Sequence, residues 1–283
     1  MITPFDTKGI DFERMKRQLE MQIVHGANAV VIAGTTGEVA TLEEREYEML
    51  ASLCVREAEG RVKVIFGIGG NDTEKCLKNA RFAKRIGADA VLMTPPYYNK
   101  TSPDGLREHF LYVADQVDLP LILYNIPGRT AIGISAETYS LLAEHPNING
   151  VKEASGDFSL IARIASECCD RLWIWSGNDD HTVPMMSLGA LGVISVASNL
   201  IPGEMARLCA ECRSGDYARA AALFFEYADL FRDLFIETNP IPVKAAMQLL
   251  GTDSGILRRP LVPISAAHLA QLQRTMRRVG LLG

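Results

Sequence analysis

The chain has 283 residues and a formal net charge of −5 at pH 7, with 48% hydrophobic and 22% charged residues. This composition is typical of a globular protein, and the absence of an offsetting basic segment argues against nucleic acid as the main partner. No apolar run approaches the ~18 residues of a membrane span and the first residues lack a signal-peptide pattern, so we expect a cytoplasmic protein without membrane partners.

Short apolar segments of β type alternate with amphipathic segments of helical period along most of the chain. The predicted strands cover residues 29–33, 62–67, 90–94, 121–124, 149–152, 172–176 and 192–196. The predicted helices cover residues 12–25, 42–59, 73–86, 103–116, 135–144, 160–169 and 182–188. Nearly continuous apolar strands separated by helices, at a spacing of about thirty residues, predict a parallel sheet covered on both faces.

Seven strands are one fewer than a closed barrel of eight βα units needs. We place the missing strand at Met1 and Ile2, which makes it very short. The remaining predicted segments are helical and cover residues 204–213, 217–237, 242–250 and 266–279. The prediction is a (β/α)8 TIM barrel with its active site over residues 1–215, followed by a helical C-terminal extension over residues 216–283 that packs on the barrel.

A doubly wound open sheet is the alternative architecture. It would need a glycine-rich dinucleotide loop after a strand and an acidic residue at the end of the next strand. The segment Gly67-Ile68-Gly69-Gly70 follows a predicted strand but lacks the full glycine pattern, and the next strand ends in Met93-Thr94. The barrel is therefore the preferred architecture.

Residues at the carboxyl ends of the predicted strands are candidates for an active site, because TIM barrels carry their chemistry there. The segment LILYNIPGRT (121–130) places Tyr124 at the end of one strand and Arg129 in the loop that follows it. Lys152 ends the next strand. A phenol, a guanidinium and an amine at neighbouring strand ends are the groups that Schiff-base chemistry on a keto acid needs.

Each of these residues also has an ordinary structural explanation. Tyr124 alone is typical of a half-buried core residue, Lys152 of a solvated strand end, and GTTGE (34–38) of a turn that caps a helix. Their occurrence at the same end of successive strands favours the catalytic interpretation. A lysine nucleophile must be neutral, and burial or a nearby cation lowers a lysine pKa from about 10.4. Tyr124 would relay protons if its hydroxyl is linked to Thr35 and a second tyrosine.

Neither the cysteines nor the histidines form a metal-binding pattern. Cys209 and Cys212 make a CxxC within a helical pattern, but no second CxxC or histidine pair completes a zinc set. The five histidines are scattered. Because an imine itself supplies the electron sink, we expect neither a metal nor a cofactor.

Five motifs resemble those of a known family. They are GTTGE (34–38), TPPYYNK (94–100), YNIPGRT (124–130), VKEASG (151–156) and SGNDD (176–180). They resemble the pyruvate-dependent, Schiff-base class I aldolases of the dihydrodipicolinate synthase/N-acetylneuraminate lyase superfamily, and the resemblance extends from Thr3-Pro4-Phe5 to NPIPVK (239–244) and beyond. It implies a TIM-barrel lyase that needs no cofactor.

The resemblance also implies catalytic roles for four residues. Lys152 would form the imine with pyruvate, and Tyr124 would act as general acid and base. Thr35 and Tyr98 would complete the proton relay, with Tyr98 reaching into the site of a neighbouring subunit. A shared relay requires at least a dimer, and the family is commonly a dimer of dimers, so we expect a homo-oligomer.

Four further residues are implied in substrate binding. The backbone amides of Thr35 and Thr36 would hold the pyruvate carboxylate, Arg129 the carboxylate of the second substrate, and Gly177 and Ile194 would line the pocket. A guanidinium at position 129 suits a small carboxylated aldehyde. The resemblance therefore implies condensation of pyruvate with L-aspartate-4-semialdehyde, then cyclisation, in diaminopimelate and lysine biosynthesis.

Two alternatives remain at this point. One is a related aldolase, an N-acetylneuraminate lyase or a 2-keto-3-deoxy sugar acid aldolase, although these generally lack an arginine at this position. The other is a non-catalytic barrel that binds a ligand, against which the set of Lys152, Tyr124, Thr35 and Tyr98 argues, since a binding module needs no nucleophile.

The resemblance also bears on regulation, because many members of the family are inhibited by lysine at a tight-dimer interface. The corresponding positions are here Val39, Glu44, Tyr47, Asn71, Lys75 and Tyr97. Lys75 stands where inhibited bacterial members carry a carboxylate for the lysine amine. A like charge repels that amine, so we expect weak or absent feedback by lysine.

Overall fold

The computed structural model describes residues 1–168 and 170–283, and Cys169, which ends the predicted helix 160–169, lies outside the described residues. All seven predicted strands are present within one residue of their predicted ends, except that the last ends three residues earlier. They are β3 (Ala29–Ile32), β4 (Lys63–Gly67), β5 (Ala90–Met93), β6 (Leu121–Asn125), β7 (Ile148–Glu153), β8 (Trp173–Ser176) and β9 (Gly192–Val193). They form a seven-stranded sheet in chain order, which confirms the α/β fold class.

The predicted helices are present as well, with ends within two residues, except that α10 ends four residues earlier. They are α1 (Phe12–Val24), α2 (Glu44–Ala58), α3 (Thr73–Ile86), α4 (Pro103–Gln116), α6 (Ala136–Leu142), α7 (Phe158–Glu167), α8 (Thr182–Ser187), α9 (Pro202–Ser214), α10 (Tyr217–Asp233), α11 (Ile241–Leu249) and α12 (Ala266–Arg278). Four short helices were not predicted: α5 (Pro127–Thr130) and the 3₁₀ helices η1 (Val39–Thr41), η2 (Asp179–His181) and η3 (Ala197–Asn199). Within the described residues, no helix has the length and apolar character to cross a membrane.

Short polar side chains begin most of these helices. Asp72 accepts hydrogen bonds from the first amides of α3, and Ser102, followed by Pro103, does so for α4. Ser135 and Asp157 cap α6 and α7 in the same way. Each cap satisfies an amide that has no partner inside the helix, which fixes where the helix starts after its strand.

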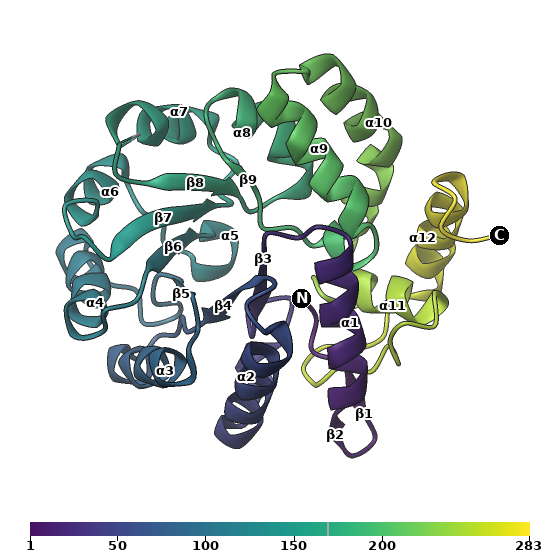
Figure 1. The fold of residues 1–283 in the computed structure, drawn as a ribbon, viewed down its shortest axis with the longest axis horizontal. Helices are drawn as coiled ribbons and strands as arrows, with labels where there is room; N and C mark the ends of the chain where they lie inside the picture. The colour runs from purple at the N-terminus through teal and green to yellow at the C-terminus, as the bar shows by residue number, and fades with distance from the viewer. Residues whose placement is uncertain (169) are drawn as a thin grey trace. The chain divides into compact units, whose positions relative to one another are not determined.

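The chain forms two compact units, and one is the continuous segment 65–194. In this unit each strand pairs in parallel with the next, and helices α3, α4, α6, α7 and α8 lie along the outer side of the strands (Figure 1). Every residue of β5 and β6 is buried, as their apolar sequences require. Parallel pairing brings the carboxyl ends of β4 to β9 to one edge of the sheet.

The other unit combines residues 1–64 with residues 195–283. In it α10 packs against α9 and α12 (Figure 1). The fully buried carboxylate of Asp233 on α10 accepts hydrogen bonds from Thr275 Oγ1 at 2.6 Å and Gln271 Nε2 at 2.9 Å, both on α12. These bonds fix the last helix against its neighbour.

The expected first strand at residues 1–2 is absent from the described structure. The Met1 amine donates to Val31 O at 2.8 Å, but the Ile2 amide donates to the Asn199 side chain at 3.1 Å. The expectation was wrong because a side chain takes the second donor, so no repeated backbone pairing develops. Two short strands follow instead, β1 (Phe5–Asp6) and β2 (Gly9–Ile10), which pair antiparallel as a small hairpin.

Burial of His109 predicts an acid-sensitive fold. His109 on α4 is buried, its Nδ1 lies 2.8 Å from Thr73 Oγ1 at the start of α3, and burial lowers its pKa from 6.5 to about 4. Because the folded protein holds this proton more weakly, the unfolded chain binds more protons between pH 4 and 6.5. Stability is therefore full above pH 6.5 and falls by up to about 3 kcal/mol as the pH drops to 4. Urea unfolding at several pH values measures this, and His109→Gln should flatten that part of the slope; equal slopes in both proteins would contradict it.

Candidate active site

Tyr124 and Lys152 are brought together by the register of two parallel strands. Tyr124 on β6 lies opposite Lys152 on β7, and the Lys152 Nζ atom is 4.2 Å from the centroid of the Tyr124 ring. Tyr124 is buried and Lys152 half-buried. Among the described residues, no carboxylate lies within ion-pair distance of this amine. An amine beside a phenol, without an acidic partner, is suited to nucleophilic attack assisted by proton transfer.

Gly177 and Ile194 lie at the ends of the next two strands. The Gly177 amide donates to Glu153 O at 2.8 Å, and the Ile194 amide donates to Ser176 O at 2.9 Å. A Cβ atom at Gly177 would lie 2.6 Å from Ala154 Cβ and 3.2 Å from Lys152 Cε. Any larger residue at position 177 would therefore press on the lysine side chain, so the structure brings Gly177 into contact range of Lys152.

The opposite face of the same two strands carries a buried carboxylate that we had not predicted. Glu153 lies opposite Asn125 in the register, and its side chain is buried. Its oxygens accept hydrogen bonds from Asn125 Nδ2 at 2.9 and 3.1 Å, from Tyr139 OH at 3.0 Å and from the Ser155 amide at 2.7 Å. Burial and this carboxylate together raise the pKa of Tyr139 well above 10.

This network fixes the strand positions next to Tyr124 and Lys152. Successive residues of a strand point to opposite faces, so the Asn125–Glu153 pair holds the backbone while Tyr124 and Lys152 face the other way. The signal was available in the sequence, because YN at 124–125 and KE at 152–153 have the alternation of two half-polar strand ends. Our prediction treated both strands as uniformly apolar and therefore missed Glu153.

Arg129 lies in α5, the short helix after β6, and is exposed. The loop is tied down at both ends. Asn125 Oδ1 accepts a hydrogen bond from the Ile134 amide at 3.1 Å, and Thr130 Oγ1 donates to Ile132 O at 2.6 Å. The guanidinium is thus carried by a short ordered turn that starts directly from the strand that ends in Tyr124 and Asn125.

Tyr98 has an unusual conformation after β5. Its φ angle is 69°, in the left-handed region, and its side chain is 94% exposed. The segment is held by the Asn99 side chain, whose Nδ2 donates to Asn71 O at 2.8 Å. No described contact brings Tyr98 to Tyr124, so the structure of the single chain does not assemble the predicted relay at this residue.

Thr35 and Thr36 belong to the unit formed by residues 1–64 and 195–283, in the turn that follows β3. The Gly37 and Glu38 amides donate to Gly34 O and Thr35 O, both at 3.1 Å, which closes the turn. Within the described residues, the backbone amides of Thr35 and Thr36 have no acceptor. Free amides on a tight turn form an anion-binding concavity.

The described histidines, cysteines and carboxylates were compared with the arrangements that bind metal ions. Among residues 1–168 and 170–283, no group of three or more His, Cys, Asp or Glu side chains is arranged to hold a metal ion. The thiols of Cys54 and Cys76 are buried, and burial raises the pKa of each to about 12. Such thiols are inert as ligands and nucleophiles.

The chain is similar over its whole length to enzymes of one family. The model of the dihydrodipicolinate synthetase family matches residues 1–279. A protein named 4-hydroxy-tetrahydrodipicolinate synthase from Thermoanaerobacter sp. (strain X514) is 43% identical over 283 residues, which are 100% of this chain and 95% of the relative.

Solved structures of this family have the same fold. The crystal structure of dihydrodipicolinate synthase from Aquifex aeolicus is 41% identical with a TM-score of 0.98, covering 99% of this chain and 96% of that one. The structure from Cyanidioschyzon merolae with lysine bound is 39% identical with a TM-score of 0.97, covering 100% and 97%. The fold, the full-length sequence match and the strand-end pair of Tyr124 and Lys152 agree: this chain belongs to the dihydrodipicolinate synthetase family.

Proposed function

We propose that this chain is a lyase that catalyses the 4-hydroxy-tetrahydrodipicolinate synthase reaction, in which pyruvate condenses with L-aspartate-4-semialdehyde in lysine biosynthesis. The observation that carries the proposal is the Lys152 amine 4.2 Å above the Tyr124 ring, at the carboxyl ends of two paired strands. Full-length relatives that bear the synthase name support the same reaction.

The amine of Lys152 starts the proposed reaction. Lys152 attacks the keto carbon of pyruvate, and loss of one water from the carbinolamine leaves a protonated imine. Removal of a proton from the methyl carbon gives an enamine, which forms a C–C bond to the aldehyde carbon of the second substrate. The amino group of that substrate then attacks the imine carbon, which closes the ring and releases Lys152. Each step moves a proton, and Tyr124 is the proposed donor and acceptor.

Thr35, Thr36 and Arg129 complete the proposed site as the resemblance assigns them. Free amides at Thr35 and Thr36 support binding of the pyruvate carboxylate, and the Thr36 hydroxyl already accepts from Asn239 Nδ2 at 2.8 Å, which leaves its own hydrogen to donate. An exposed guanidinium at Arg129 on an ordered turn supports capture of the second carboxylate. Gly177 and Ile194 are the proposed pocket lining.

We further propose that the protein works as a homo-oligomer in which Tyr98 enters the site of a partner and serves with Thr35 in the relay. A bulky residue at positive φ is strained, and in the single chain 94% of the Tyr98 side chain is exposed, so few contacts compensate for that strain. The dimer of dimers is also a proposal. Large exposed apolar side chains support a second contact; they are Phe158, Trp173, Leu188 and Leu191.

Several expectations stay predictions. They are the division of the chain into a barrel at residues 1–215 and a helical C-terminal extension at residues 216–283, the cytoplasmic location, and an imine mechanism that needs no cofactor.

The first prediction of the proposed function concerns the nucleophile. Wild-type protein given pyruvate, L-aspartate-4-semialdehyde, dihydrodipicolinate reductase and NADPH should oxidise NADPH, and Lys152→Ala should lose at least about 10³-fold in rate. Borohydride with pyruvate should fix a mass adduct on Lys152. Lys84→Ala, which removes an exposed lysine paired with Asp118, is the matched control and should keep its rate. Turnover of keto sugar acids without turnover of the semialdehyde would instead indicate a sugar-acid aldolase.

A second prediction concerns the carboxylate behind the site. In Glu153→Gln, the new side-chain NH₂ group should meet the donors Asn125 Nδ2 and Tyr139 OH, so a buried donor is left without an acceptor at a cost of about 1–3 kcal/mol. The strand end should shift, and imine formation should slow by about tenfold or more. Thermal melts and single-turnover trapping measure the two effects.

The matched control is Tyr112, whose hydroxyl donates to Glu74 at 2.6 Å on the surface, just as that of Tyr139 donates to the buried Glu153. Tyr139→Phe should destabilise the protein, whereas Tyr112→Phe should change stability by less than about 0.5 kcal/mol. Equal effects of the two substitutions would contradict the role given to burial.

A third prediction concerns regulation. Lys75 is exposed near the start of α3, where its positive charge should repel the amine of a bound lysine. L-Lysine at about 1 mM, a concentration that would saturate a strong feedback site, should therefore leave the rate unchanged. Lys75→Glu should gain sensitivity, and Lys78→Glu on the same helix is the control. A sub-millimolar inhibition constant for the wild type would overturn this expectation.

A further inference from the structure

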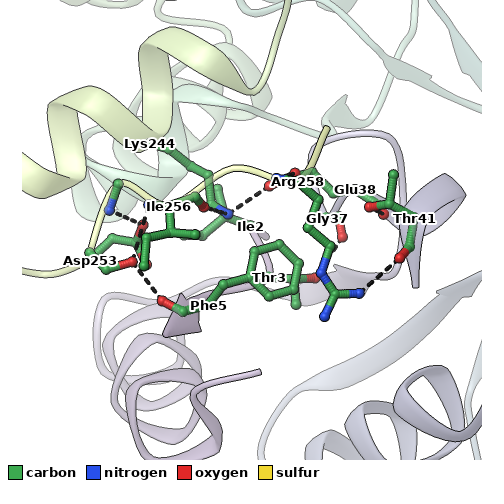
Figure 2. Close-up of polar contacts among 12 residues, drawn as sticks. Ile2, Thr3, Phe5, Gly37, Glu38, Thr41, Lys244, Asp253, Ile256 and Arg258 are labelled. Carbon is green, nitrogen blue, oxygen red and sulfur yellow. Dashed lines mark hydrogen bonds and ion pairs between the residues drawn. The ribbon is translucent and has the colours of Figure 1, made fainter. Parts of the chain in front are cut away.

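A second lysine, Lys244, differs from Lys152 because its amine is paired with a carboxylate. Lys244 on α11 is fully buried, and its Nζ donates to Glu38 Oε1 at 2.6 Å and to Ile256 O at 2.7 Å (Figure 2). The same atom lies 4.2 Å above the Phe5 ring. Burial lowers the pKa of Lys244, and the Glu38 carboxylate opposes that effect. A lysine held between two acceptors and a ring is a structural cation and not a nucleophile.

Arg258 satisfies the other side of the same carboxylate. Its backbone amide donates to Glu38 Oε2 at 2.9 Å, and its guanidinium donates to Thr41 O (Figure 2). The guanidinium also pairs with the Glu46 carboxylate and lies 4.3 Å from the centroid of the Phe5 ring. Both oxygens of Glu38 are therefore fixed by the segment 244–258. The side chain of Glu38 is only 1% exposed, so this arrangement is dry.

The turn that Glu38 ends is held in a conformation that its residues do not favour. Ala33 and Glu38 flank it with φ angles of 52° and 54°, in the left-handed region, although neither is glycine. Thr3 Oγ1 donates to Gly37 O at 2.6 Å, and a Cβ at position 37 would lie only 3.3 Å from that hydroxyl. Residues in such conformations persist when the surrounding structure over-determines them.

A buried ion pair is a weak device for stability alone, because desolvation of both charges offsets most of their attraction. Such a pair does fix the position of whatever its two ends carry. Here Glu38 ends the turn with the free amides of Thr35 and Thr36, and Lys244 lies on α11. We therefore attribute the Glu38–Lys244 pair to positioning of the turn rather than to stabilisation of the fold.

We propose that Glu38 and Lys244, with Thr3, are positioning residues that hold the turn 34–38 so that the Thr35 and Thr36 amides converge on the carboxylate of pyruvate. This inference rests on the proposed function of that turn. Removing the pair should impair capture of pyruvate while the chemistry at Lys152 remains intact.

The test uses variants that separate geometry from buried charge. Glu38→Gln or Lys244→Met alone leaves one buried charge without its partner and should destabilise the protein strongly. The double variant Glu38→Gln/Lys244→Met removes both charges and should melt at a higher temperature than either single variant. It should nevertheless need about tenfold more pyruvate for half-maximal borohydride trapping on Lys152, with the maximal extent of trapping unchanged.

The chain offers a matched control for this change. Lys16 and Glu13 form the same kind of ion pair at 2.7 Å on the exposed face of α1, and Glu13→Gln/Lys16→Met should leave both the melting temperature and the pyruvate dependence at wild-type values. A folded Glu38→Gln/Lys244→Met protein with wild-type pyruvate dependence would overturn the proposal. Wild-type protein that forms no pyruvate adduct at all would instead overturn the proposed function on which it rests.

Thr3→Val tests the same proposal if the double variant fails to fold. This substitution keeps the ion pair and the shape of the side chain but removes the donor to Gly37 O. We expect a folded protein whose half-maximal pyruvate concentration rises at least about threefold and whose turn amides exchange faster with deuterium. Wild-type values for both measurements would count against a positioning role.

Discussion

The candidate chemistry depends on the register between β6 and β7. One register pair, Tyr124 and Lys152, faces one side of the strands, and the next pair, Asn125 and Glu153, faces the other. A slip of one residue would exchange the two faces and bury the amine where the carboxylate now lies. Glu153 accepts hydrogen bonds from β6, from α6 and from the loop after β7, and these bonds make such a slip costly. The residues that fix the register are therefore the direct neighbours of Tyr124 and Lys152 in the two strands.

Two buried carboxylates are stabilised in different ways. Among the described residues, Glu153 accepts hydrogen bonds from neutral donors and pairs with no cation, whereas Glu38 accepts from a buried ammonium and a backbone amide. The difference suits their neighbourhoods. Glu153 is buried on the face of β7 opposite Lys152, where Asn125, Tyr139 and the Ser155 amide supply the donors. Glu38 and Lys244, in contrast, link segments 206 residues apart, and there a strong directional contact is useful.

The sequence predicted the elements well and their polar connections poorly. Apolar strands and amphipathic helices carry a periodicity, so their ends were predicted within one or two residues except at the ends of β9 and α10. The hairpin of β1 and β2 has two residues in each strand and no period to detect. Pro127 and Gly128 suggested a loop, although proline is well suited to the first turn of a helix, as α5 shows.

The polar contacts around the candidate site were equally hard to predict. The proximity of Lys152 and Tyr124 could be predicted, because strand ends are a local signal that parallel topology converts into proximity. Glu153 was within reach of the same reasoning, had the alternation of both strands been followed one residue further. The contact of Glu38 with Lys244 leaves no local trace, because nothing in either segment specifies a partner so distant in the chain.

The separation of Glu38 from Lys244 also has a consequence for synthesis on the ribosome. Residues 65–194 form a continuous unit, which is complete as soon as that stretch has emerged. The turn at residues 34–38 waits for Lys244 and Arg258. At about 5–20 residues per second, that wait lasts roughly 10–40 s. A nascent or prematurely ended chain that stops before residue 244 would thus contain Lys152 but lack the contacts that anchor the turn at residues 34–38.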